Sequence, residues 1–252
     1  MELVRIGVVA LVVASAMSLG LGFDGTQTNT RASSLPPGVD NGSLNATALV
    51  AAHERSLADT AVAIETSRAT WNTDAGGNQT TTIRTLTDGN GTVWRRRVTD
   101  AGEQSRVEEW TDGRRSYRYI AADGETVSTD AVTSPSQRYL TARLRAWLDT
   151  GQYTLAAVES GTPPRYVLET TTYTPPDGEP LEADTVRYEA TVVVTGTGRV
   201  QAMSATLRTI ETNRWGRQVR SQSYSYRVVR TGDVTTPTPD WLPNRAAEGN
   251  DG

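Results

Sequence analysis

The chain has 252 residues, which is enough for one large β domain or two small ones. It contains no cysteine and one histidine, so the sequence excludes a disulfide-stabilised scaffold and a zinc site built from cysteines and histidines. The formal net charge is −4 at pH 7, and nucleic acid is therefore not an expected partner. Any domain in this chain must be held together by its packed core alone.

The composition points to a salty habitat. All 25 basic residues are arginine, and lysine is absent. Arginine is more weakly hydrated than lysine and makes forked contacts, which suits molar salt, where the Debye length falls to about 3 Å. With abundant acidic residues and threonine, this balance is typical of haloarchaeal proteins. A GC-rich genome also favours arginine codons, so adaptation and mutational bias both remain open as explanations.

Residues 1–23 predict export. Arg5 precedes an apolar run from Ile6 to Phe23, which contains the small-residue triplet Ala14-Ser15-Ala16. A basic start, an apolar run and such a triplet are typical of a secretory signal, and the run is also just long enough for a membrane anchor. Both alternatives stay open, and in each the chain after Asp24 lies outside the membrane. The expected location is the cell surface, either tethered or secreted.

The exported part is expected to be one domain. Residues 24–40 are rich in Thr, Asn, Ser, Pro and Gly, which predicts a flexible linker. Residues 41–245 form the predicted β-rich domain, and residues 246–252 a disordered tail. Four Asn-x-Ser/Thr triplets are candidate glycosylation sites: Asn41, Asn45, Asn78 and Asn90.

The periodicity of apolar residues predicts an α+β fold. A helix is expected over residues 45–59, capped by Asn45, and a second after Ser134, with Leu140 on its apolar stripe. Elsewhere the period is two, and Gly-containing turns separate the segments. The expected strands lie near 60–70, 80–87, 92–99, 104–110, 114–121, 152–159, 165–174, 183–195, 198–212 and 216–230. A long antiparallel sheet must coil, so we expect a half-barrel covering the two amphipathic helices.

Three short motifs carry a resemblance to a known family. They are Pro36-Pro37-Gly38-Val39, Ala51-Ala52-His53 followed by Leu57, and Pro239-Asp240-Trp241. With them the chain resembles haloarchaeal exported lipoprotein-like proteins of uncharacterised function, whose architecture is similar to the bacterial carrier LolA and the mycobacterial LppX-type glycolipid carriers. The resemblance implies a LolA-like fold over nearly the whole exported part. Family members typically carry a lipobox cysteine, which Ser18–Gly22 lacks, so tethering would depend on the apolar run.

The sequence predicts no catalytic residue, metal or cofactor. His53 lies on the apolar side of the first helix without a thiol partner, which favours a half-buried structural role. Asp88 and Asn90 have the spacing of oxygen ligands, but hairpin-turn chemistry explains them. Glu108 and Glu109 are neighbours on a strand and point to opposite faces, where they offer cross-strand partners to the arginines of residues 95–97.

Two functions remain open from the sequence. The first is a non-enzymatic surface protein that binds a lipid or another apolar ligand in the concave face of its sheet. Its candidate lining residues are Trp94, Tyr117, Tyr119, Leu144, Trp147, Tyr188, Tyr224 and Tyr226. The alternative is a structural or interaction protein of the archaeal cell envelope, in which the same residues fill a solid core and a partner protein binds outside. An enzyme is not expected.

Overall fold

The computed structural model describes residues 35–40, 43–73, 77–122, 124–130, 133–175, 183–214 and 216–242. These belong to one compact unit, Ser34–Gly252, which is separate from a unit formed by Met1–Ser33. The predicted N-terminal segment, residues 24–34 of the linker, Asn41 and the predicted tail therefore lie outside the described residues. Within the described ranges, no helix is long and apolar enough to cross a membrane.

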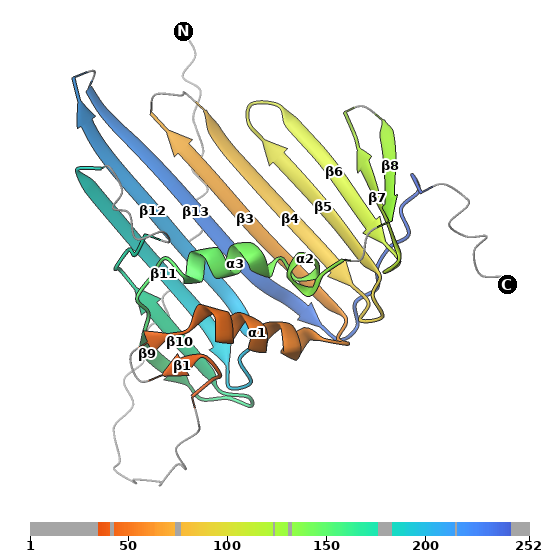
Figure 1. Cartoon of the computed structure of the whole chain (residues 1–252), viewed down its shortest axis with the longest axis horizontal. Helices are drawn as coiled ribbons and strands as arrows, with labels where there is room; N and C mark the ends of the chain where they lie inside the picture. The colour runs from red at the N-terminus through yellow and green to blue at the C-terminus, as the bar shows by residue number, and fades with distance from the viewer. Residues whose placement is uncertain are drawn as a thin grey trace, which may run out of the picture. The chain divides into compact units, whose positions relative to one another are not determined.

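The predicted α+β fold is confirmed, with a large, curled antiparallel sheet and helices on one of its faces (Figure 1). The strands are β1 (Val39–Asp40), β2 (Ser43–Leu44), β3 (Val62–Asn72), β4 (Asn78–Thr87), β5 (Val93–Asp100), β6 (Gln104–Thr111), β7 (Arg115–Ile120), β8 (Glu125–Asp130), β9 (Thr154–Glu159), β10 (Arg165–Thr170), β11 (Thr185–Thr195), β12 (Val200–Asn213) and β13 (Gly216–Thr231). The helices are α1 (Ala46–Leu57), α2 (Pro135–Arg138) and α3 (Thr141–Leu148).

The main sheet has 11 strands in the order β8-β7-β6-β5-β4-β3-β13-β12-β11-β10-β9. It consists of two antiparallel meanders, β3 to β8 and β9 to β13, which are joined where the last strand pairs with the first. The chain must pass from β8 at one edge to β9 at the other, and the segment that makes this crossing carries α2 and α3. Because neighbouring strands lie about 4.8 Å apart, this segment must extend across the full width of the sheet, from one edge strand to the other. The side on which the helices lie is called the helix face below, and the opposite side the outer face.

Helix α1 packs by the apolar stripe that its sequence predicts. The side chain of Asn45 accepts a hydrogen bond from the Ala48 N–H at 2.9 Å, so the predicted N-cap is confirmed. Leu49, Ala52 and Leu57 are at most 3% exposed. Leu49 and Leu57 meet Ile64 of β3 and the apolar residues of β11 to β13 in one core cluster. The core therefore lies between the helices and the central strands.

The second predicted helix is interrupted at Leu140. Ser134 and Gln137 form a capping box around α2, with Pro135 at its first position. Leu140 then takes a left-handed conformation, with φ of 58°, and α3 begins at Thr141. Tyr139, just before the break, is 3% exposed, and its hydroxyl donates to the carbonyl of Leu57 at 3.0 Å. Burial of Tyr139 offsets the strain at Leu140, which local helix propensity does not anticipate.

The outer face of β6 and β7 is covered by the C-terminal strap, residues 232–242. Trp241 stacks on Tyr119 with ring centroids 5.5 Å apart, and its indole N–H donates to Glu108 Oε2 at 2.7 Å. Glu108 is 4% exposed, and its other oxygen accepts from Arg106. Leu242 is buried beside this contact. The strap thus builds a small second core on the face opposite the helices.

Replacing Trp241 by Ala is expected to lower the free energy of unfolding by about 2 kcal/mol. The change removes the ring stack and leaves one oxygen of the buried Glu108 carboxylate without its donor. Urea denaturation of the two proteins measures the difference. Trp71→Ala is the matched control, because Trp71 is 42% exposed and its loss should cost less than about 0.5 kcal/mol. Equal losses in the two variants would show that the strap does not contribute to stability.

Candidate ligand-binding site

Five of the eight predicted lining residues pack against one another beneath the helices. Trp147 of α3 lies flat between Tyr188 and Tyr224, with centroid separations of 6.2 and 5.8 Å and interplanar angles of 9° and 4°. Leu144 and Tyr226 complete this group, at 0% and 1% exposure. The hydroxyl of Tyr188 donates to the carbonyl of Trp147 at 3.0 Å. The space that the sequence predicts as a ligand cavity is filled here by the indole of Trp147.

The other three predicted lining residues lie on the outer face. Directly opposite residues on neighbouring strands share a face of the sheet. The register pairs Trp94 with Trp110 and Trp110 with Tyr117, and it pairs Tyr119 with Glu108, so all of these side chains lie on the face away from the helices. Trp110 and Tyr117 contact each other at 6.0 Å. The eight residues therefore do not surround one cavity, and whether any of them contacts a ligand stays a prediction.

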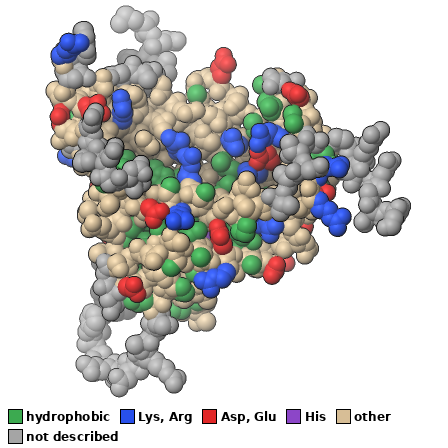
Figure 2. All heavy atoms as spheres, in the orientation of Figure 1, with side chains coloured by type: hydrophobic (Ala, Val, Ile, Leu, Met, Phe, Trp, Pro, Cys, Tyr) green, Lys and Arg blue, Asp and Glu red, His purple; other side chains and the backbone are tan. Residues whose placement is uncertain are grey.

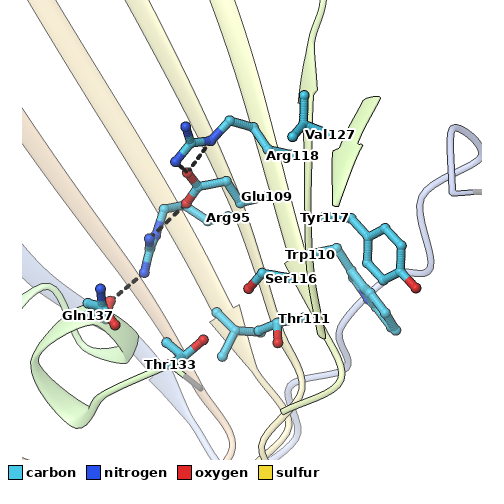
Figure 3. A pocket seen from close by; sticks show the side chains of 11 residues that line it. Arg95, Glu109, Trp110, Thr111, Ser116, Tyr117, Arg118, Val127, Thr133 and Gln137 are labelled. Carbon is cyan, nitrogen blue, oxygen red and sulfur yellow. Dashed lines mark hydrogen bonds and ion pairs between the residues drawn. The ribbon is translucent and has the colours of Figure 1, made fainter. Parts of the chain in front are cut away.

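A hollow of about 260 Å³ lies on the helix face of β5 to β8, beside α2 (Figure 3). Three charged side chains cross it in a row. Arg95 Nη1 donates to Glu109 Oε2 at 2.9 Å, and Arg118 Nε donates to Glu109 Oε1 at 3.1 Å. Arg95 also donates to the carbonyl of Gln137 in α2 and to Thr85 Oγ1. The row therefore connects three strands of the sheet to the crossing segment.

The remaining walls of the hollow are small and mixed in polarity. Val93 and Val127 supply apolar surface, whereas Thr111, Ser116 and Thr133 supply hydroxyl groups. In Figure 3 the rings of Trp110 and Tyr117 point away from the hollow, toward the outer face. Figure 2 shows the same face in space-filling form, with a red carboxylate among blue arginine side chains beyond the helices. This part of the helix face is polar and open, in contrast to the packed aromatic core.

The hollow carries an excess of positive charge. Burial alone would raise the pKa of Glu109, but Arg95 and Arg118 hold it below its usual value, with a further contribution from Arg97. Burial lowers the pKa of Arg95, and Glu109 opposes that shift. The side chain of Arg118 is 60% exposed, whereas that of Arg95 is 14% exposed. Glu109 is thus an ionised bridge between two arginines, and Arg118 keeps donors free to face a ligand.

The sequence anticipates the charged row but not its surroundings. The prediction that Glu108 and Glu109 lie on opposite faces and pair with neighbouring arginines is confirmed for Glu109 by its contact with Arg95. Val127 and Thr133 come from an edge strand and from the segment after it, and neither has a local signal in the sequence. The sequence predicted charge pairing on these strands and no ligand site among them.

His53 has a structural role, and it is fully buried rather than half-buried. Its Nδ1 accepts from the Val200 N–H at 3.1 Å, so Nε2 carries the proton and donates to the Tyr226 hydroxyl at 2.7 Å. Tyr226 in turn donates to the carbonyl of Tyr139 at 3.3 Å. Burial, assisted by the positive charge of Arg199, lowers the pKa of His53 to about 3. Both ring nitrogens are occupied in joining α1 to β12 and β13.

The predicted hairpin chemistry at Asp88 and Asn90 is seen in the structure. Asp88 Oδ1 accepts from the N–H groups of Asn90 and Thr92 at 2.9 and 3.2 Å, as in an Asx turn. Within the described ranges, no group of three or more His, Asp or Glu side chains is placed to hold a metal ion. Asn45, Asn78 and Asn90 are exposed, and their glycosylation stays a prediction.

No family model matches the sequence, and no curated protein matches it either. Among solved structures, the chain is similar to LprF from Mycobacterium bovis, with 11% identity, a TM-score of 0.38, and coverage of 79% of this chain and 99% of that one. For lipoprotein LppX from Mycobacterium tuberculosis the identity is 10%, the TM-score 0.35, and the coverages 77% and 98%. For a LolA superfamily protein from Nitrosomonas europaea the identity is 11%, the TM-score 0.27, and the coverages 79% of this chain and 100% of that one.

The structural neighbours therefore include proteins of the LolA and LppX class, as the sequence motifs suggest. The haloarchaeal origin stays a prediction from composition.

Proposed function

We propose that the chain is a non-enzymatic protein of the cell exterior that binds an amphipathic ligand through an anionic group. In this proposal, Arg118 and the Arg95–Glu109 pair hold the anionic group in the hollow of β5 to β8. An apolar chain, such as that of a lipid, extends from it past Val127. The observation that carries the proposal is the exposed guanidinium of Arg118 at the wall of an open, positively charged hollow.

The size of the hollow limits the ligand. About 260 Å³ is slightly below the range of roughly 300–1,000 Å³ that holds drug-sized molecules. A headgroup fits this volume and a whole membrane lipid does not. Because the aromatic core is filled by Trp147, the apolar part of the ligand must lie along the face of the sheet rather than beneath the helices.

The test compares hexyl phosphate with hexanol, titrated into the full chain held in nanodiscs of neutral lipid. We expect one hexyl phosphate to bind per chain and hexanol to bind far more weakly, since only the phosphate accepts charge-assisted hydrogen bonds. Arg118→Gln should weaken hexyl phosphate binding by about 10- to 100-fold. Calorimetry measures both affinities.

The matched control for this test is Arg96→Gln. Arg96 is the exposed neighbour of Arg95 on the same strand and lies on the outer face, so its loss removes the same charge without touching the hollow. Equal affinities for hexyl phosphate and hexanol would contradict the proposal, as would equal effects of the two substitutions.

The second candidate function is that of an envelope protein with a solid interior and a protein partner outside. The close packing of Trp147 between two tyrosines favours it, because a carrier needs space for its cargo. This candidate predicts no binding of either hexyl compound. The titration therefore separates the two functions.

A further inference from the structure

Four arginines meet at the end of the sheet where β11 ends and β12 begins. They are Arg165, Arg199, Arg227 and Arg230, and they border a shallow hollow of about 400 Å³, called the arginine corner below. Arg165 and Arg227 alternate with the buried Tyr166 and Tyr226, so their side chains lie on the outer face. The arginine corner is therefore separated from the candidate ligand site by the sheet itself.

The arginines of this corner have few acidic partners. Arg165 is 4.0 Å from Glu159, a weak and exposed pair. Among the ion pairs of the described residues, none involves Arg199, Arg227 or Arg230; Glu65 lies opposite Arg227 in the strand register but pairs with Arg84. The whole chain is acidic, with a net charge of −4, so this local excess is not a consequence of overall composition. A cluster of guanidinium groups that outnumber the neighbouring carboxylates favours an external partner that is rich in anions.

The nearness of the arginine corner to the N-terminal apolar run indicates which kind of anion it would meet. A Cβ placed on Gly198 would lie 3.3 Å from Pro37 Cδ, so the start of the described chain packs on the turn that carries Arg199. Only 11 residues, Asp24–Ser34, separate Leu35 from the apolar run that ends at Phe23. A chain of that length spans at most about 40 Å. If the apolar run is an anchor, a bilayer surface is within reach of the arginine corner.

One apolar side chain lies among the arginines. Val229 is 48% exposed and sits at the bulge where the β13–β3 register shifts, between Arg227 and Arg230. An exposed apolar residue surrounded by basic ones is typical of surfaces that dock on lipid headgroups. We propose that the arginine corner is a docking surface for an anionic lipid bilayer, with the guanidinium groups on headgroup phosphates. This proposal does not depend on the ligand proposed for the hollow of β5 to β8.

The test follows the distance from the corner to the bilayer by energy transfer. The chain has no cysteine, so Asp233→Cys gives a single labelling site just after β13. The labelled full chain is reconstituted in vesicles of phosphatidylcholine, with or without phosphatidylglycerol, that contain an acceptor lipid. We expect higher transfer in the anionic vesicles than in the neutral ones, with a difference that narrows as the salt concentration rises, because salt screens exposed charges. A label at Thr212, at the far end of β12, should show no such difference.

The decisive variant replaces Arg199, Arg227 and Arg230 by Gln. Each arginine near an anionic surface contributes roughly fivefold, so the ratio of docked to undocked molecules should fall about a hundredfold. The transfer should then return to its value in neutral vesicles. The control is Arg187→Gln with Arg208→Gln, because these exposed residues pair on the same outer face, away from the corner. Equal transfer in neutral and anionic vesicles would overturn the proposal, as would a triple variant that behaves like the unaltered chain.

Discussion

Lowering the pH from 7 to 5 is expected to reduce the free energy of unfolding by about 2 kcal/mol, through His53 alone. In the unfolded chain a histidine binds its proton near pH 6.5, whereas burial lowers the pKa of His53 in the folded protein to about 3. Between these values the unfolded state holds the additional proton. Stability is therefore complete above pH 6.5 and falls as the pH decreases toward 3. Urea denaturation at several pH values measures this slope.

The composition of the chain makes this slope unusually easy to assign. His53 is the only histidine, cysteine is absent, and ordinary carboxylates titrate below about pH 4.5. The variant His53→Gln should be less stable at pH 7, because its amide replaces the bonds to Val200 and Tyr226 imperfectly, and its stability should be nearly constant between pH 7 and 5. A flat profile for the unaltered protein would mean that folded His53 binds a proton near its ordinary pKa.

Trp147→Ala is expected to lower the free energy of unfolding by about 3 kcal/mol, because the half-buried indole packs against the core. It leaves a gap beside Tyr188 and Tyr224, on whose rings the indole stacks. Because the gap is bordered by aromatic rings, added indole should fill it and restore part of the lost melting temperature. Thermal unfolding with and without indole provides the measurement.

The same variant tests whether the aromatic core can open to admit a ligand. If the aromatic core opens to admit a lipid, Trp147 must leave its place easily, and its removal should cost less than about 1 kcal/mol. A large loss with rescue by indole is the behaviour of a packed core. The ligand would then have to bind elsewhere, as proposed for the hollow beside Arg118.

The sequence predicts the strands of this fold well because their signals are local. Alternation and glycine turns place β4 to β7, and the later strands end within a few residues of their predicted limits. It misses β8, in which Val127 is the only large apolar residue. The sequence also predicts one continuous helix through Leu140, because leucine is a good helix former. The break there depends on the burial of Tyr139 against other elements, which nearby residues do not indicate.

The candidate site could be predicted only in part, because alternation gives two faces and does not say which face the helices cover. Aromatic residues such as Trp94 and Tyr119 are natural candidates for the covered side. They lie instead on the outer face, where Trp241, more than a hundred residues later in the chain, stacks on Tyr119. The arginines that alternate with them consequently face the helix side. Which face of β5 to β7 is covered by helices is decided by the tertiary contacts of the strap and of the crossing helices.

The most direct test of the proposed function is native mass spectrometry of the full chain, released from nanodiscs of neutral lipid after incubation with hexyl phosphate. The proposal predicts one adduct per chain in the unaltered protein and in Arg96→Gln, and its loss in Arg118→Gln. An adduct that survives Arg118→Gln, or no adduct in any of the three proteins, would contradict ligand binding in the hollow between α2 and β5 to β8.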